Sequence, residues 1–391
     1  MRSLPFRVAH LATVDMSLEL LLGPQLDGVL AAGGEPIGIS APGPFVPAVI
    51  ARGARHIPLT GSTRGWSLRG DLRAAVALWG ILRRERPTVL HTHNPKPGFY
   101  GRIVGRLAGV PVVVNTVHGL YATPDDPWPR RAVVYALEWF ASRWSHVELV
   151  QNQEDVDTIR RWHLAPTRRV RHLGNGVDLG RFRPGRLDHR QRRRLRSSWG
   201  ADDDTLVVGT VGRLVAEKGY PELFTAVAPL APSVRLVVVG GRDDDKTDAL
   251  DPSVLAEAER SGVVLLGHRD DVAELLGGFD VFVLASHREG QPRAAMEAAA
   301  SGLPVVATDI RGCRQVVDHG VTGTLVPVGD AAGLRQAIVE LAADRRAGLA
   351  QGAAGARKAR REFDERDVVA RVLDAYRTAA ARRGISLTVA P

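Results

Sequence analysis

Two glutamates on either side of a predicted helix start are the first residues whose type and spacing indicate chemistry. Glu289 lies just before a helix expected at Ala294–Ser301, and Glu297 lies on its second turn among methionine and alanine residues. The free amides of a helix start attract anions, and Pro292 suits a first helical turn. A charge on so apolar a helix is costly unless it is paired or bound. The two glutamates therefore suit a ligand that joins phosphate to hydroxyl groups, although Glu289 alone could simply stabilise the helix dipole.

A glycine and two cations follow the expected strand Leu206–Val211. Gly212 allows close backbone approach, while Arg213 and Lys218 place a forked donor and a point charge beside a predicted helix start. A diphosphate needs these groups together with free amides. The alternative is a pair of surface cations, and Glu217 could pair with either of them.

Histidines and one aspartate follow strands of the first half. His118 ends an apolar run, and His91 and His93 end the run before it. A lone histidine is more often structural than catalytic, but the place of His118 at a strand end favours a role in a site. His91 and His93 have no clear carboxylate or thiolate partner, so we expect no metal. Asp15 follows the first strand and could face a site or belong to the turn.

Short β-branched runs alternate with amphipathic stretches along the chain. The expected strands are Phe6–Val14, Glu35–Ser40, Thr88–His93, Val110–His118, Val147–Asn152, Val170–Gly174, Leu206–Val211, Val234–Gly240, Gly262–Leu266, Val281–Ala285, Pro304–Thr308 and Thr324–Val328. Helices are expected between them, for example at Leu68–Arg84, Pro97–Ala108 and Arg130–Trp144. Continuous apolar runs are typical of parallel strands buried on both faces. The alternation predicts an α/β, doubly wound fold, whose ligands bind outside the carboxyl ends of the strands.

The rhythm breaks at the arginine-rich, Gly/Pro-punctuated stretch 180–200. We therefore predict a Rossmann-like domain at residues 1–185 and another at residues 200–362, with a ligand cleft between them. A chain of 391 residues suits two such domains. A last helix at about residues 364–385 follows the final strand with no strand of its own, and it could pack back on the first domain.

Composition places the chain among soluble globular proteins, since 45% of its residues are hydrophobic and 24% are charged. Its single cysteine, Cys313, permits no internal disulfide and fits a reducing compartment. The N-terminus lacks the apolar core of a signal peptide. No run reaches the ~18 apolar residues of a membrane span. We expect a cytoplasmic protein that lies peripherally on the inner face of the cell membrane.

The net charge of +9 is unevenly distributed. Residues 1–180 carry +7 and residues 181–200 another +7, whereas residues 201–350 carry −9. This asymmetry favours an anionic partner for the first half, such as a lipid surface or a phosphate. Nucleic acid is not expected, because the basic residues lack interleaved aromatics and no nucleic-acid module appears. Arg130–Trp144 combines aromatic and apolar residues with arginines, so it is either an interfacial helix or a buried amphipathic one.

These residues resemble the family 4 retaining glycosyltransferases, which have the GT-B fold. The matching stretches, in the expected order over about residues 7–330, are His118-Gly119, Asn175-Gly-Val-Asp178, Gly212-Arg213 with Lys218-Gly219, and Glu289-Gly290-x-Pro292 with Glu297-Ala298 and Gly302-x-Pro304-Val-Val-Ala307. The resemblance implies two doubly wound Rossmann-like domains around a cleft. It also implies transfer of a hexosyl or N-acetylhexosaminyl unit from a nucleotide-diphosphate sugar, with a UDP-sugar favoured.

The resemblance also assigns roles to residues. Arg213 and Lys218, beside Gly212, would neutralise the donor diphosphate without a metal or other cofactor, and Arg269 would lie near the base. Backbone amides around Gly290, Gln291, Pro292 and Arg293 would help bind the diphosphate. Glu297 would hold the ribose, Glu289 the sugar hydroxyls, and His118 would reach the sugar from the first domain as the second catalytic candidate.

Within the family, the chain looks most like bacterial capsular and exopolysaccharide enzymes that extend polyprenyl-diphosphate-linked sugars. The likeness rests on the stretches 91–98, 116–119 and 307–314. It implies a lipid-linked or saccharide acceptor, for which Asp15, His93 and Lys96 are the candidate contacts. The glycine pair common after the family's first strand is absent here, so its acceptor contacts are not carried over. Gln291 stands where a bulkier apolar residue is common, so selectivity for donor hydroxyls stays open.

Two alternatives remain. A sugar-nucleotide 2-epimerase shares the architecture, but it would need acid/base carboxylates from both domains and would act without an acceptor. A non-catalytic sugar-nucleotide-binding subunit would not need an intact site, whereas Arg213, Lys218, Glu289 and Glu297 are all present.

Overall fold

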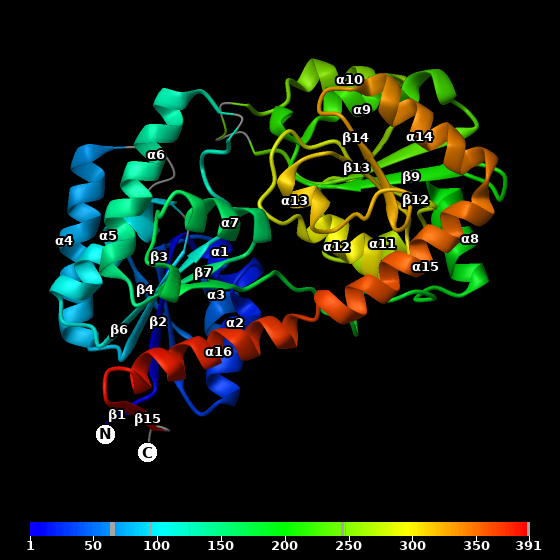
Figure 1. Cartoon of the computed structure of the whole chain (residues 1–391). Coiled ribbons are helices and arrows are strands. Elements are labelled where there is room, and N and C mark those ends of the chain that lie inside the picture. Colours follow the sequence, from blue (N-terminus) through cyan, green and yellow to red (C-terminus); the bar gives the residue numbers. More distant parts are fainter. Residues whose placement is uncertain (63–66, 94, 125, 244–245, 247, 389–391) are drawn as a thin grey trace. The chain divides into compact units, whose positions relative to one another are not determined.

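The chain folds into two compact units. The computed structural model describes residues 1–62, 67–93, 95–124, 126–243, 246 and 248–388. The first unit comprises Met1–Gly174 with Arg366–Pro391, and the second comprises Asn175–Glu365. Each is built on a parallel sheet with helices on both faces, as Figure 1 shows. The predicted pair of doubly wound Rossmann-like domains is confirmed. Asn94, part of the stretch 91–98 discussed above, lies outside the described residues.

The sheet of the first unit has the strand order β4-β3-β2-β5-β6-β7-β8, and all neighbours are parallel. Its strands are β2 (Arg7–Val14), β3 (Glu35–Ala41), β4 (Arg55–Pro58), β5 (Val89–Thr92), β6 (Val112–Val117), β7 (Val147–Val150) and β8 (Val170–His172). The strand order changes direction between β2 and β5. The carboxyl ends of these two strands are therefore where a ligand is expected.

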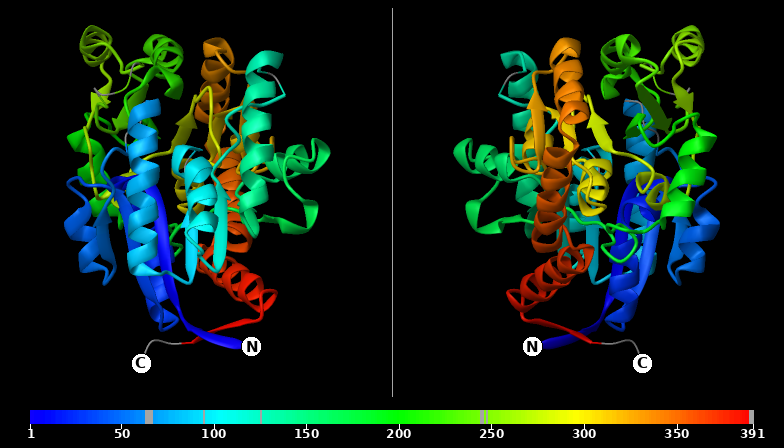
Figure 2. Two further views of the ribbon diagram at one scale, coloured as in Figure 1. Left: turned by 90° about the vertical axis from the view of Figure 1, so that its left-hand side faces the viewer. Right: turned by 90° about the vertical axis from the view of Figure 1, so that its right-hand side faces the viewer.

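Helices cover both faces of the first sheet. They are α1 (Asp15–Leu20), α2 (Gly23–Ala31), α3 (Val46–Ala51), α4 (Leu68–Glu85), α5 (Pro95–Leu107), α6 (Trp128–Ala141), α7 (Gln153–Arg161) and α16 (Glu365–Ala381). Leu78 of α4 and Val104 of α5 belong to the core on one face, whereas Val29 of α2 and Val372 of α16 belong to the core on the other. Helix α5 packs against both α4 and α6. Figure 2 shows the three helices side by side, coloured from blue through cyan to teal.

The second unit repeats the plan with the strand order β11-β10-β9-β12-β13-β14. Its strands are β9 (Leu206–Val211), β10 (Val234–Val239), β11 (Val264–Leu265), β12 (Val281–Leu284), β13 (Val305–Thr308) and β14 (Gly323–Val326). Its helices are α8 (His189–Ser198), α9 (Tyr220–Val227), α10 (Pro252–Arg260), α11 (Val272–Leu276), α12 (Arg293–Ala300), α13 (Arg311–Arg314), α14 (Ala331–Ala343) and α15 (Arg345–Glu362). Here the order changes direction between β9 and β12, and the loops that follow these strands contain most of the predicted donor residues.

Three strands were not expected from the sequence. They are β1 (Arg2–Pro5), β4 and β15 (Ile385–Thr388), each four residues long. β15 pairs in parallel with β1, Arg2 opposite Ile385, so the expectation that no strand follows the last helix was wrong. Such short strands are stabilised by partners distant in sequence rather than by a local pattern.

The predicted linker at 180–200 was also wrong, because this stretch belongs to the second unit. Arg196 of α8 is buried and donates to Asp280 Oδ2 at 2.8 Å, and Arg192 donates to Asp280 Oδ1 at 2.6 Å. Arg186 pairs with Glu274. The chain passes between the units at 174–175 and again at 365–366. Part of the charge that suggested a basic first half is therefore neutralised inside the second unit.

The loops after β9 and β12 touch at Gly219. This residue has φ of +70°, and a Cβ on it would lie 2.0 Å from the carbonyl oxygen of Ala285, the residue after β12. Glycine removes both the steric clash and the strain of a left-handed conformation.

No helix within the described ranges has the length and apolar character needed to cross a bilayer.

Replacing Gly219 should therefore destabilise the protein more than replacing a glycine that needs only the left-handed conformation. Gly185 has the same φ of +70° but open space around its Cβ position. We expect Gly185→Ala to lower the free energy of unfolding by about 1 kcal/mol and Gly219→Ala by about 3 kcal/mol. Chemical denaturation of both variants measures the difference, and equal losses would show that the two loops do not touch.

Candidate active site

An ion pair joins the two loops at the switch point of the second unit. Lys218 Nζ donates to Glu289 Oε1 at 2.6 Å, and the hydroxyl of Ser286 donates to the same oxygen at 2.9 Å. Both charged side chains are mostly buried. The structure thus brings together a predicted diphosphate cation and a predicted sugar-binding carboxylate. Ser286 was missed from the sequence, although its position in the loop that follows β12 could have indicated it.

Backbone contacts hold this pair in place. The amide of His287 donates to the carbonyl of Glu217 at 2.8 Å, which ties the two loops beside Gly219. A Cβ on Gly312 of α13 would lie 2.8 Å from the carbonyl oxygens of both Glu289 and Gly290. The loop therefore rests directly on the backbone of α13, and little space is left for it to shift.

The other predicted cation, Arg213, is paired as well. Its guanidinium contacts the carboxylate of Asp243, and its side chain is about half exposed. Gly212 accepts a hydrogen bond from the hydroxyl of Tyr220 at 2.7 Å. Both predicted diphosphate-binding cations are thus paired with nearby carboxylates, a pairing that the sequence did not specify.

Helix α12 begins at Arg293, so Pro292 is its N-cap and not part of its first turn. The carbonyl of Gln291 accepts from the side-chain amide of Asn175 at 3.2 Å. The side-chain oxygen of Gln291 is shielded from solvent and has no hydrogen-bond donor in the described part of the chain. A buried acceptor without a donor is unfavourable, so this oxygen is suited to a ligand hydroxyl.

Glu297 lies on α12 with its side chain 14% exposed. Burial raises the pKa of this carboxyl to about 7, an effect that nearby Arg293 and Arg181 oppose. Arg293 lies 3.7 Å away. A partly neutralised, partly desolvated carboxylate is poised to accept hydrogen bonds from a ligand that supplies them.

Two further arginines differ in whether they act on Glu297. Arg269 is exposed and directed onto its neighbour Asp271 at 2.6 Å, so the structure shows no contact that ties it to the other predicted donor residues. Arg181 contacts the carbonyl of Asp270 and acts electrostatically on Glu297. Arg181 was missed because it lay in the stretch interpreted as a linker.

The first unit uses two of its candidate acceptor residues for its own structure. Asp15 is buried and accepts from the amides of Met16 at 2.9 Å and Phe45 at 2.7 Å. Lys96 is buried against Asp71 of α4, with Nζ 2.5 Å from Oδ1. Asp15 therefore holds the loop before α3, and Lys96 joins α5 to α4, so we do not carry them into the proposed acceptor site.

His118 lines a polar pocket of about 80 Å³ with Arg102, Asn115 and Glu138. Arg102 is fully buried and donates to Glu138 at 2.9 Å and Glu148 at 3.0 Å. Burial lowers the pKa of His118 to about 4, with Gln151 acting weakly in the opposite direction. The histidine is therefore neutral at physiological pH, and it can accept or donate one hydrogen bond with each ring nitrogen but carries no charge.

His93 is fully buried directly behind His118. Its Nδ1 lies 3.1 Å from His118 Nε2, and its Nε2 lies 3.1 Å from Nδ1 of His10. His10, His91 and His93 place ring nitrogens within 4.8 Å of one another. The sequence indicates His91 and His93 as a pair but gives no sign of His10. His10 lies inside β2, where nothing in the local pattern distinguishes it from a core residue.

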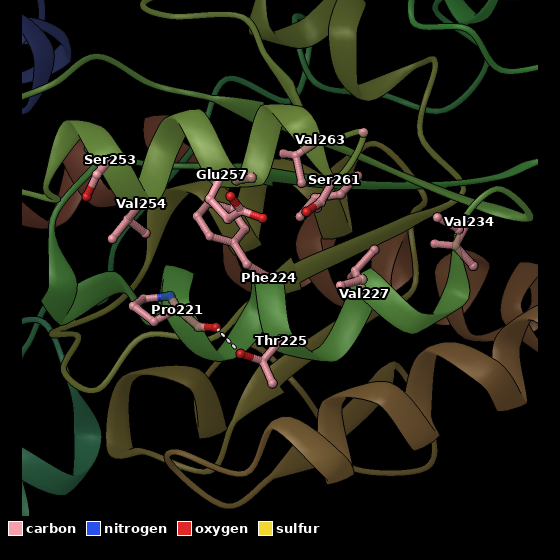
Figure 3. A pocket seen from close by; sticks show the side chains of 15 residues that line it. Pro221, Phe224, Thr225, Val227, Val234, Ser253, Val254, Glu257, Ser261 and Val263 are labelled. Carbon is pink, nitrogen blue, oxygen red and sulfur yellow. Dashed lines mark hydrogen bonds between the residues drawn. The ribbon is translucent and has the colours of Figure 1, made fainter.

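A separate cavity of about 500 Å³ lies between α9 and α10 (Figure 3). Phe224, Val254 and Val263 line it, with Glu257 at one side. Its lining does not include Lys218, Glu289 or Glu297. This cavity is mostly apolar and is lined by none of the predicted donor residues, so we do not assign it to the site.

Comparison with known proteins identifies the family. Residues 30–181 match the family described as "Glycosyltransferase Family 4", and residues 205–344 match "Glycosyl transferases group 1". The two matches lie mainly in the first and second units respectively.

Curated relatives of known name are similar over most of the chain. An Escherichia coli protein named UDP-Gal:alpha-D-GlcNAc-diphosphoundecaprenol alpha-1,3-galactosyltransferase is 31% identical over 72% of this chain and 73% of its own length. A D-inositol 3-phosphate glycosyltransferase of Xylanimonas cellulosilytica is 32% identical over 81% of this chain and 79% of its own.

Solved structures have the same fold at low sequence identity. A sucrose-phosphate synthase from Thermosynechococcus elongatus has a TM-score of 0.81 at 21% identity, covering 96% of this chain and 99% of its own. A glycosyltransferase from Rickettsia africae has a TM-score of 0.78 at 16% identity, covering 96% and 98%. The motifs, the two parallel sheets and these relatives lead to one conclusion: the chain belongs to the family 4 glycosyltransferases and has their GT-B fold.

Proposed function

We propose that the protein transfers a hexosyl or N-acetylhexosaminyl unit from a UDP-sugar, with retention of configuration, to a polyprenyl-diphosphate-linked saccharide. The observation that carries the proposal is the Lys218–Glu289 pair at the switch point, beside the start of α12. It brings a cation for the diphosphate next to a carboxylate for the sugar. The name of the E. coli relative, which contains both a UDP-sugar and a diphosphoundecaprenol, supports the choice of donor and acceptor.

Donor binding would rearrange the charges seen in the ligand-free site. The diphosphate offers Lys218 and Arg213 more negative charge than Glu289 and Asp243 do, so both cations would turn to it. Glu289 would then be released to accept hydrogen bonds from the sugar hydroxyls. The amides at the start of α12 would add to the stabilisation of the diphosphate leaving group. None of these steps requires a metal ion.

Retention would follow from the direction of attack. The acceptor hydroxyl would approach on the face that the diphosphate leaves, and the leaving phosphate oxygen would take its proton. His118 would contact the reacting sugar as a neutral hydrogen-bonding group. The buried side-chain oxygen of Gln291, which accepts no hydrogen bond from the described residues, would accept one from a hydroxyl of the transferred sugar. We assign no residue as a covalent nucleophile.

A donor and acceptor screen tests the proposal directly. The full chain is incubated with a panel of UDP- and GDP-sugars, with and without polyprenyl-diphosphate-linked saccharides, and the product is analysed by NMR for its anomeric configuration. We expect an α-linked product from an α-linked UDP-sugar only when acceptor is present. Interconversion of donor sugars without acceptor would favour the 2-epimerase, and inverted products would contradict retention.

Lys218 and Glu289 should have opposite effects on nucleotide binding. Lys218→Ala removes a charge-assisted contact and leaves Glu289 unpaired beside the diphosphate, so UDP affinity should fall by about 10- to 100-fold. Glu289→Ala releases Lys218, so UDP affinity should be kept or tightened while turnover falls at least about 100-fold. Isothermal titration calorimetry and initial rates measure the two effects.

Arg260→Ala is the charge-matched control for Lys218→Ala, because Arg260 is a largely exposed cation of the same unit on α10. UDP affinity in this control should equal that of the wild type. If Lys218→Ala also binds UDP with wild-type affinity, the diphosphate does not use this lysine.

The raised pKa of Glu297 means that its ionised carboxylate destabilises the folded protein when no ribose is bound. A carboxyl whose pKa is about 7 when folded and about 4.5 when unfolded binds a proton more tightly in the folded state. Stability is therefore lost as pH rises from about 4.5 to about 7, and the loss persists above that. A residue kept despite such a cost is suited to ligand binding, and ribose hydroxyls would compensate the ionised carboxylate.

Glu297→Gln should consequently stabilise the ligand-free protein at pH 8, by a free energy on the order of 3 kcal/mol, with little effect near pH 4.5. The same variant should bind UDP more weakly at pH 8. Chemical denaturation and calorimetry at the two pH values check both statements. Glu274→Gln is the control of opposite sign, since the hydrogen bond from Arg186 lowers the pKa of Glu274, and its removal should destabilise at pH 8. A Glu297→Gln variant less stable than wild type at pH 8 would contradict the assignment.

We further propose that α6 lies on an anionic lipid surface. Val133, Leu137 and Phe140 are spaced along one side of this helix and are 61%, 39% and 45% exposed. Trp128 and Trp139, 74% and 49% exposed, share a groove of about 360 Å³ with Tyr135 and Trp162. Exposed apolar side chains with tryptophans are typical of interfacial helices. Tyr135 and Ala141 of the same helix are buried, and the exposure of its apolar outer side supports an interfacial helix over the alternative of a buried amphipathic one.

Cations accompany this apolar face. The guanidinium of Arg143 lies 4.1 Å from the ring centre of Trp139, and that of Arg131 lies 5.9 Å from that of Trp162. Arginine beside aromatic rings suits the boundary between anionic head groups and acyl chains. A lipid-linked acceptor would be met at such a surface.

Replacing two apolar residues of α6 with acids should abolish this binding. Val133→Glu/Phe140→Glu should co-sediment with phosphatidylglycerol-containing liposomes at least about tenfold less than wild type at low salt. Leu349→Glu on α15 is the control, because Leu349 is 73% exposed in the second unit and its replacement should leave binding unchanged. Wild-type protein that ignores anionic liposomes at low salt would end the membrane proposal.

A further inference from the structure

A chain of hydrogen-bonding groups runs through the interior of the first unit and ends at His118. The phenol of Tyr376, on α16, lies 2.6 Å from Nδ1 of His91 and 3.5 Å from Nε2 of His10. His10 Nδ1 lies 3.1 Å from His93 Nε2, and His93 Nδ1 lies 3.1 Å from His118 Nε2. The chain thus joins the last helix to the candidate catalytic histidine through two intervening rings.

The members behind His118 are sealed from water. His10, His91, His93 and Tyr376 are all 0% exposed. Burial lowers the pKa of His10 to about 3 and holds the pKa values of His91 and His93 well below their usual range. The rings are therefore neutral at physiological pH, and each has one donor and one acceptor nitrogen.

Neutral rings in series must share one direction of donation. If His118 Nε2 donates to His93, then His93 Nε2 donates to His10, whose own Nε2 donates to the phenol oxygen of Tyr376. If any one ring reverses, its neighbours must reverse with it or lose a hydrogen bond. An unmade hydrogen bond at a buried group is unfavourable, so the series stays aligned.

The hydroxyl of Tyr376 decides the direction. A phenol is a better donor than acceptor, and its short contact is with His91, whose other nitrogen lies 2.7 Å from the hydroxyl of Thr116. When the phenol donates to His91, its oxygen is left as an acceptor for His10. His118 is then protonated on Nε2, and Nδ1 is its unprotonated nitrogen. That atom is shielded from solvent and makes no hydrogen bond of normal geometry among the residues described. The side chain of Gln151 lies near enough to the ring to raise its pKa slightly, so Gln151 is the neighbour that a ligand hydroxyl would displace or share.

We propose that His93, His10 and Tyr376 are positioning residues that fix both the orientation and the tautomer of His118, so that Nδ1 faces a ligand hydroxyl as an acceptor. The proposal rests on the proposed function in one respect, namely that His118 contacts the reacting sugar. A function in packing alone would be served by apolar side chains, which need no partners in a core. Both ring nitrogens of His91 are already engaged by hydroxyl groups, so the cluster is complete as a hydrogen-bonded network.

Nitrogen-15 NMR of the full chain labelled at histidine tests the network without reference to activity. Protonated and unprotonated ring nitrogens have well-separated shifts, and His118→Asn identifies the signals of His118. In wild type we expect His118 to be neutral and protonated on Nε2. In Tyr376→Phe, which removes one hydroxyl from the far end of the chain, the tautomer ratio of His118 should change although the two residues are not in contact.

Tyr100→Phe is the matched control, since Tyr100 is buried on α5 of the same unit and is not a member of the chain of hydrogen bonds. It should leave the signals of His118 unchanged. Should Tyr376→Phe fail to fold, His93→Gln provides a second interruption, and the wild-type tautomer is itself a sufficient test. A His118 protonated on Nδ1, or signals of His118 that do not change in Tyr376→Phe, would overturn the proposal.

Steady-state kinetics with the donor found active in the screen separate positioning from structure. Tyr376→Phe should lower kcat about tenfold or more and leave the KM for donor nearly unchanged, whereas Tyr100→Phe should change neither. A changed tautomer with wild-type kcat would refute the positioning role. Absence of any transferase activity in the wild type would instead contradict the proposed function, and the NMR result would still decide whether the network exists.

Discussion

The ion pair between Lys218 and Glu289 is the interaction on which the second unit's candidate site depends. It spans two loops that follow neighbouring strands, β9 and β12, and it requires those loops to touch. Gly219 permits that contact because it lies against the backbone of Ala285, and Gly312 packs against the backbone of Glu289 and Gly290. An unpaired lysine or glutamate at this depth would be costly. The pair therefore leaves this part of the site without net charge, and in the proposed function a diphosphate would take the place of Glu289 as the partner of Lys218.

The first unit handles buried polarity differently. Arg102 is fully buried and stays charged, because Glu138 and Glu148 both accept its hydrogen bonds. The histidines nearby stay neutral, because burial disfavours their charged form. In the proposed function, a neutral His118 would hydrogen-bond the sugar without attracting the diphosphate. The two units thus supply different chemistry, charge compensation in one and neutral hydrogen bonding in the other.

The fold and the donor-binding loops could be predicted from the sequence. Parallel strands buried on both faces appear as continuous apolar runs, and the candidate functional residues lie in the loops after the carboxyl ends of these strands. β9 was predicted to the residue, and the loops after β9 and β12 contained the residues that the structure brings together. The contacts that could not be predicted join residues that are far apart along the chain. The partner of His91 is 285 residues away. Asp280, which holds α8 to the second unit, is 84 residues from Arg196.

The pairing of β1 with β15 bears on how the protein folds during synthesis. Thr388 and Leu4, which share a hydrogen bond across this pair, are 384 residues apart, and α16 supplies Tyr376 and Val372 to the core of the first unit. A ribosome completes the second unit before it releases α16. The first unit is therefore completed last. Until α16 has been synthesised, the face of the sheet that α16 covers remains exposed to water. Such delayed long-range closure is slow and leaves apolar surface open to aggregation. Chaperone demand should consequently fall on the N-terminal half of the chain.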